Sequence, residues 1–425
     1  MSGNSLQVGV GKAEIQIPHE IFPIENFGGI HDRIYVRALI MKVNVNVVII
    51  SLELTSLKAY ELDKLKEIAA DITKISQENI WICVTHTFNA PHVRSKESQT
   101  TAEAVTKNEM LCQAIEDALS DALKQSLQTL KQAAIGSNTT SAYVNANRDI
   151  ETANGWWLGI NDSGNSDKSV EVLRFDDKNG QPIAVLYNYN VQSSIMDGSL
   201  MKDGCRLVSG DLAGAASRFI ESEYSQDFVA LFCLGAAGDQ APMFKSKHVF
   251  TDRFGNPQET DLQDDGWFLV DLLGRRLANQ VVQVMERTKA ETIEGSISKE
   301  RFSCNCPGQQ IPPKLSDLRP AKSYKYVKGK AREAVIEIIR LGDTVIVGLQ
   351  AEIISSIASE IKAASPFRQT MVCTMVNGGE KYLADKAAYE RNTYEAMNSY
   401  YACGAAEILT GEIIRQLNHL SMNRR

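Results

Sequence analysis

Short apolar runs alternate with amphipathic segments along most of the 425-residue chain. Runs rich in β-branched residues predict buried strands, and apolar residues at three- and four-residue spacing predict helices. Strands are expected at residues 45–54, 79–87, 182–191, 228–235 and 370–376, and a β-hairpin is expected at 333–341 and 344–350. Helices are expected at residues 58–72, 108–133, 212–224, 268–287, 353–364 and 398–417.

This order predicts an α/β protein. Strands that alternate with helices imply a mixed, largely parallel sheet or sheets with helices packed on the faces. The chain shows no internal repeat and no low-complexity linker, so residues 1–425 are expected to form a single large domain. Residues 154–169 and 251–266 are polar and rich in glycine, and both are expected as long loops. The acids of the second segment do not have the spacing of a calcium-binding EF-hand loop.

Composition narrows the classes of partner and compartment. The formal net charge of -7 and the lack of a like-charge block argue against nucleic acid and against a membrane surface. No apolar run approaches the roughly 20 residues of a membrane span. The first residues lack the basic and apolar regions of a signal peptide, so we expect a cytoplasmic protein, or a secreted one if a leader was trimmed. The oligomeric state is left open.

The eight cysteines indicate a reduced protein. Cys83, Cys233 and Cys373 stand inside apolar runs, where a buried free thiol is the simplest interpretation. Cys304 and Cys306 are spaced as a metal-binding pair, but no second Cys/His pair has zinc-finger spacing. A structural zinc site is therefore the less favoured alternative.

Polar groups follow the carboxyl ends of five predicted strands. The candidates are His86 and His92 after residues 79–84, residues 191–198 after 182–190, Asp239 in the Gly/Ala-rich turn 235–242, Glu352 after 344–349, and Tyr382 after 370–376. Ligands of α/β proteins bind outside the carboxyl ends of strands, so these groups predict one common site. Taken singly, each has a structural explanation, such as a hydrogen-bonded histidine or a carboxylate at a helix N-terminus.

Five short blocks also occur in a characteristic order. They are residues 8–15 (VGVGKAEI), 28–39 (GGIHDRIYVRAL), 84–92 (VTHTFNAPH), 144–149 (VNANRD) and 208–221 (VSGDLAGAASRFIE). In order and rough spacing they resemble the neutral/alkaline (non-lysosomal) ceramidase family. The chain is identified as a divergent member that corresponds to the family's catalytic N-terminal domain and ends where its C-terminal β-sandwich domain would begin.

The resemblance implies a zinc-dependent amidase that cleaves an N-acyl carbon–nitrogen bond. It implies that His86, Glu352 and Tyr382 are zinc ligands and that Arg148 and Tyr394 are active-site residues. Such a site makes chemical sense, because zinc lowers the pKa of a bound water to about 7 and polarises the amide carbonyl. Arginine or tyrosine donors then stabilise the developing oxyanion.

Three positions depart from the family pattern. Gln192 stands where the family has its second zinc histidine, and an amide oxygen is a poor zinc ligand. Ala241 replaces the catalytic serine, and Phe88 replaces the second histidine of the Thr-His-Thr-His block. His31 and His92 are possible substitutes for the lost histidine, and His31 is kept as a candidate catalytic residue.

The substrate side of the site is expected near the segment after Arg148. Trp156 and Trp157 resemble the family's substrate-side region, although aromatic residues that anchor a long loop are an equal alternative. The candidate substrate-binding residues are Gln192, Asp239, Ala241 and Trp157.

Two functions follow. The first is a divergent ceramidase-like hydrolase of carbon–nitrogen amide bonds that acts on a soluble small-molecule N-acyl amide, with its zinc dependence left open. The second is a non-hydrolytic ligand-binding protein, or an enzyme of the same fold with another reaction, and Gln192 and Ala241 motivate it. Metal content and the positions of His86, Glu352 and Tyr382 separate the two.

Overall fold

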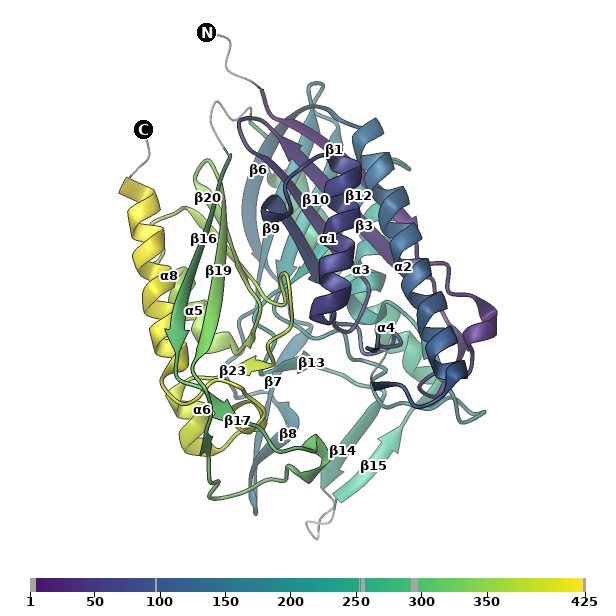
Figure 1. Cartoon of the computed structure of the whole chain (residues 1–425), viewed down its shortest axis with the longest axis vertical. Helices are drawn as coiled ribbons and strands as arrows, with labels where there is room; N and C mark the ends of the chain where they lie inside the picture. The colour runs from purple at the N-terminus through teal and green to yellow at the C-terminus, as the bar shows by residue number, and fades with distance from the viewer. Residues whose placement is uncertain (1–4, 96–97, 252, 254–256, 292–296, 423–425) are drawn as a thin grey trace.

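The computed structural model describes residues 5–95, 98–251, 253, 257–291 and 297–422. Within these residues, two β-sheets lie face to face, and each carries helices on its outer face (Figure 1). The α/β class with mixed sheets is therefore confirmed.

The larger sheet has the described strand order β12-β10-β9-β6-β1-β3-β4-β5. The bounds are β1 Gln7–Glu14, β3 Tyr35–Lys42, β4 Asn46–Leu52, β5 Ile80–Val84, β6 Lys131–Ser141, β9 Ser169–Asp177, β10 Pro182–Tyr189 and β12 Val229–Leu234. In the described sheet only β4–β5 and β10–β12 pair in parallel, and the other neighbours are antiparallel. The expected largely parallel sheet is thus corrected to a largely antiparallel one, because a helix crossover joins neighbouring strands only at β4–β5 and β10–β12.

The smaller sheet has the described order β16-β19-β20-β22. Its strands are β16 Ile297–Cys306, β19 Arg332–Leu341, β20 Thr344–Leu349 and β22 Gln369–Cys373. The predicted hairpin is confirmed, since β19 and β20 pair antiparallel. The two sheets approach closely at Gly348, where an added Cβ would lie 2.9 Å from the ring of the buried Trp81.

Helices cover both outer faces. On the larger sheet lie α1 Ala59–Thr73, α2 Ala102–Gln128, α3 Asp211–Ser222 and α4 Trp267–Arg287. On the smaller sheet lie α5 Ser355–Ala364 and α8 Ala405–Met422. Strands β4, β5, β12, β20 and β22 are buried along nearly their whole length, which explains why their sequences are continuous apolar runs. Among the described helices, none is both long and apolar enough to cross a bilayer.

The two segments expected as loops contain strands. Residues 155–161 form β8 (Gly155–Asn161), which pairs with β7 (Asn145–Thr152). The second segment contains β15 (Pro257–Asp261), which pairs with β14 (Lys247–Thr251). Pairing with a neighbouring strand stabilises these segments despite their polar composition.

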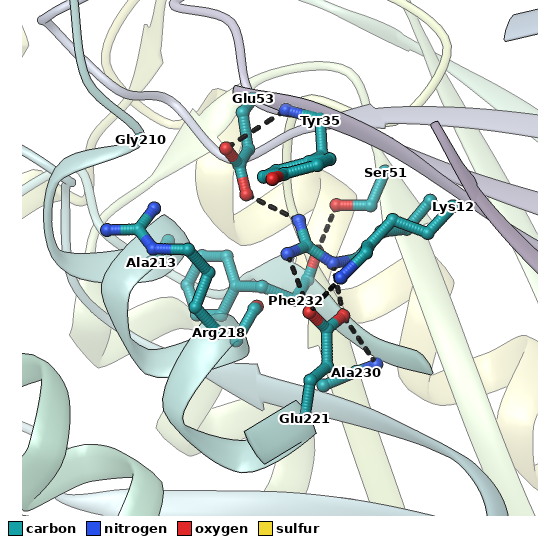
Figure 2. Close-up of polar contacts among 12 residues, drawn as sticks. Lys12, Tyr35, Ser51, Glu53, Gly210, Ala213, Arg218, Glu221, Ala230 and Phe232 are labelled. Atoms are coloured by element: carbon teal, nitrogen blue, oxygen red, sulfur yellow. Dashed lines mark hydrogen bonds and ion pairs between the residues drawn. The ribbon is translucent and has the colours of Figure 1, made fainter. Parts of the chain in front are cut away.

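A buried ion network joins the larger sheet to α3 (Figure 2). Arg37 donates from Nε to Glu221 at 2.7 Å and from Nη1 to Glu53, while Lys12 reaches Glu221 at 2.8 Å. Burial would lower the pKa of Arg37, but the two carboxylates raise it, so the guanidinium stays charged. An added Cβ on Gly210 would lie 2.6 Å from Glu53, so only glycine fits where α3 begins.

Candidate active site

A buried histidine and a buried glutamate meet between the ends of the two sheets. His86 follows β5, and Glu352 follows β20; the two residues are 7% and 5% exposed. His86 Nε2 lies 3.5 Å from Glu352 Oε2, and His86 Nδ1 lies 2.6 Å from the carbonyl oxygen of Thr55. The contact of Nδ1 with Thr55 orients the ring so that Nε2 faces the carboxylate, and in the described part of the chain Nε2 has no hydrogen-bond partner.

The charges of this pair reinforce each other. Burial would lower the pKa of His86, but the Glu352 carboxylate raises it. Burial would likewise raise the pKa of Glu352, but His86 and Arg148 lower it. Each shift favours the charged form, so the pair is an imidazolium and a carboxylate over a wider pH range than either residue alone.

Backbone pairing places the other strand-end residues beside this dyad. Glu352 and Tyr382 are register partners in the short parallel pair β21 (Glu352–Ile353) and β23 (Tyr382–Leu383). A bridge between Thr87 and Ser193 brings the segment of His86 against the segment of Gln192. The predicted convergence of residues far apart in the chain is therefore present.

Asp211 forms hydrogen bonds with the segment that follows His86 and with the segment that follows Gln192. Its carboxylate accepts hydrogen bonds from the backbone of Ile195 and Met196, at 3.0 and 2.9 Å, and from Asn89 Nδ2 at 3.1 Å. Asp211 is the first residue of α3, directly after Gly210, so the ion network of Arg37 and Glu53 lies one residue from these hydrogen bonds. The Ser-x-Asp block thus has a structural function.

Gln192 links the glutamate to an arginine. Its amide nitrogen donates to Glu352 Oε1 at 2.7 Å, and its amide oxygen accepts from Arg148 Nη1 at 2.8 Å. The opposite amide orientation would place an oxygen against a carboxylate and an NH₂ against a guanidinium, so the partners fix this orientation. Arg148 also donates from Nε and Nη2 to Glu395, at 2.9 and 2.6 Å.

Glu395 was not identified from the sequence, although it directly follows Tyr394. It is fully buried and shares its environment with Asp149. Burial, followed by the charge of Glu395, raises the pKa of Asp149 to about 9. One proton on this pair leaves a single negative charge opposite the guanidinium of Arg148, which balances the charges behind the dyad.

The dyad opens into a cavity of about 280 Å³. Tyr382 and Tyr394 line it, their rings 5.9 Å apart and both beneath the Arg148 guanidinium. Asn398 Nδ2 donates to the Tyr394 hydroxyl at 3.1 Å, which leaves the hydroxyl proton free for a ligand. Burial raises the pKa of both tyrosines, so their hydroxyls remain protonated donors.

Other candidates lie beside the cavity or away from it. Trp157 packs edge-on against Tyr394, with ring centroids 5.6 Å apart. Ala241 is buried in β13 (Gln240–Pro242), and Asp239 accepts from Ser355 Oγ at 2.8 Å, so neither is among the residues that line the cavity. His92 lines the outer wall, where Nδ1 contacts Glu25 at 2.8 Å.

His31 lies outside this cavity. Its ring stacks on Trp267 at 3.7 Å, and Nδ1 contacts Asp32 at 3.1 Å. Its expected catalytic role has no support from this position and stays a prediction. The Cys304 and Cys306 sulfurs are 3.7 Å apart, and within the described part of the chain no group of three or more His, Cys, Asp or Glu is arranged to hold a metal ion.

Comparison with known proteins gives a family and a fold. The family model for neutral/alkaline non-lysosomal ceramidase, N-terminal, matches residues 23–322. A crystal structure of neutral ceramidase from Pseudomonas aeruginosa is similar at a TM-score of 0.74 and 18% identity, covering 99% of this chain and 75% of that chain. A ceramidase complexed with C2 is similar at 0.73 and 17%, covering 99% and 76%. Curated protein sequences give no match.

Neutral ceramidases depend on zinc in general, so the question is whether the side chains at this site are suitable zinc ligands. His86 Nε2 and Glu352 Oε2 are suitable ligands by type and orientation. Gln192 is not, because its oxygen is committed to Arg148 and its nitrogen faces Glu352. The residues present therefore do not fit the four-ligand zinc site that the resemblance implies.

Proposed function

Because the chain belongs to the neutral/alkaline non-lysosomal ceramidase family, we propose that it hydrolyses the carbon–nitrogen bond of small N-acyl amides with the His86–Glu352 pair as its acid–base centre. The observation that supports this proposal best is a buried imidazolium–carboxylate pair that faces a cavity also lined by two protonated tyrosines. The family and the fold support the hydrolase class, and the reaction assigned to these residues is the proposal.

The proposed reaction uses only groups that line the cavity. The Glu352 carboxylate accepts a proton from a water molecule while the water oxygen bonds to the amide carbon. The Tyr394 hydroxyl and the His86 Nε2–H donate to the oxyanion that forms. As the carbon–nitrogen bond breaks, the proton on Glu352 passes to the leaving nitrogen, which gives a carboxylic acid and an amine. Arg148 acts through Gln192 and Glu395 and is a positioning residue.

A second function is favoured by Gln192. Its side chain forms hydrogen bonds with both Arg148 and Glu352 and occupies the position of a zinc ligand. This arrangement also suits a site that binds an amide without cleaving it. In that case the cavity would recognise a small N-acyl compound as a ligand.

The test of the proposed hydrolysis is release of the amine from a series of N-acyl amides by purified protein treated with a chelator. We expect turnover that the chelator does not reduce, and loss of turnover in Tyr394→Phe by about 10-fold or more. The conservative variant Tyr143→Phe, on an exposed tyrosine, is the matched control. Saturable binding without amine release would favour the second function.

A further inference from the structure

Two lysines, Lys58 and Lys381, line the same cavity as the His86–Glu352 pair. Lys58 is exposed and Lys381 is half-buried, and both line the cavity that His86 and Glu352 face. Lys58 lies three residues after Thr55, whose carbonyl contacts His86. Lys381 precedes Tyr382, and its carbonyl oxygen accepts from the backbone of Glu352 at 2.9 Å. Both ammonium groups are thus tied by short stretches of chain to the acid–base pair.

The carboxylates around the cavity are already paired. Glu352 contacts His86 and accepts from Gln192, and Glu380 forms an ion pair with Arg332. Glu25, next to the outer wall, contacts both His92 and Arg94. Among the described residues, no carboxylate forms an ion pair with Lys58 or Lys381. The wall of the cavity therefore has an excess of positive charge.

Local fields add to this excess. Lys58 is also the N-cap residue of the 15-residue helix α1. Among the described residues, no side chain caps this end of the helix. The N-terminus of a helix carries a partial positive charge. The two lysines and this helix N-terminus favour an anion in the cavity.

From this arrangement we infer that the substrate is an N-acyl amino acid, whose carboxylate binds between Lys58 and Lys381 while its amide lies over His86 and Glu352. The inference rests on the proposed function and specifies its substrate class. In an N-acyl amino acid the carboxylate is separated from the amide nitrogen by a single carbon, which suits lysines that line the same cavity as His86 and Glu352. Ligand pockets span roughly 300–1,000 Å³, so this cavity of about 280 Å³ is at the small end. It suits the amino-acid part of the substrate, with its carboxylate and amide.

The test is a comparison of two probes that differ only in charge: N-octanoylglycine and its neutral amide, N-octanoylglycinamide. Binding is measured by calorimetry on the full chain, and amine release is measured in parallel. We expect the acid to bind about 10-fold more tightly than the amide, because charged hydrogen bonds are stronger than neutral ones. The preference should decrease at high salt, since the wall is open to solvent.

Variants assign the preference to the two lysines. The double change Lys58→Met with Lys381→Met should abolish the preference for the acid. The separate double change Lys58→Arg with Lys381→Arg keeps both positive charges and should retain most of this preference. Lys124→Met, on the exposed face of α2, is the control that should keep it. Equal binding of the two probes by the wild-type protein, or a preference that survives the double change, would overturn the inference.

The two proposals fail separately. A preference for the acid without any amine release would retain the anion site and reject the hydrolysis. Release from both probes at equal efficiency would retain the hydrolysis and reject the amino-acid substrate. If the double variant does not fold, the salt dependence of the wild-type preference decides the inference, because a preference that is independent of salt contradicts it.

Discussion

Replacing Glu352 with glutamine is expected to reduce kcat/KM for an N-acyl amide by about 10²–10⁴-fold, the usual contribution of a general acid–base group. Glutamine has nearly the same shape, and its oxygen can still accept the hydrogen bond from Gln192 Nε2. It cannot accept a proton from water, and it no longer holds the pKa of His86 above its ordinary value. The measurement is amine release under conditions where substrate is limiting.

Glu412→Gln is the matched control for this variant. Glu412 lies on α8, where it contacts Arg415 near the surface, and its change should leave kcat/KM as it is in the wild-type protein. A Glu352→Gln variant that folds and keeps activity within about threefold of wild type, well short of a general-base effect, would show that another residue accepts the proton.

Replacing Arg37 with methionine is expected to reduce the free energy of unfolding by about 3–5 kcal/mol, the typical effect of removing one partner from a buried ion pair. The change leaves the buried Glu53 without its ion-pair partner, while Glu221 keeps its ion pair with Lys12. Methionine fills a similar volume, so the loss arises mainly from the uncompensated carboxylate of Glu53. Chemical denaturation, followed by circular dichroism, measures it as a lower midpoint.

The surface pair Arg415–Glu412 again supplies the control, since Arg415→Met should leave the denaturation midpoint unchanged. If Arg37→Met unfolds at the wild-type midpoint, the network drawn in Figure 2 does not contribute to stability as described. The variant should also reduce activity, because Gly210 and Asp211 connect this network to the segments of His86 and Gln192.

The sequence predicts the location of a site residue best when that residue directly follows a predicted strand. The positions of His86, Glu352 and Tyr382 after predicted strands indicate one common site, and the resemblance to the ceramidase family implies their roles. That they belong to two sheets packed face to face could not be predicted, because periodicity within a strand does not specify which strand lies opposite. The predominance of antiparallel pairs was missed for the same reason.

Other features depend on contacts that the sequence does not reveal. Glu395 is next to the candidate Tyr394, yet only the structure shows that it pairs with Arg148. Lys58 and Lys381 are ordinary lysines in the sequence, and their significance depends on which carboxylates already have partners. His31 is part of a family-like block, but its ring stacks on Trp267 instead of lining the cavity.

Zinc titration of chelator-treated protein, with the wild type beside Gln192→His, tests most directly whether the amide network has taken the place of a metal site. We expect no stoichiometric zinc binding by the wild-type chain, and at least about 10-fold tighter binding once an imidazole is available at position 192. A stoichiometric zinc ion on the wild-type protein that His86→Ala removes would contradict the account.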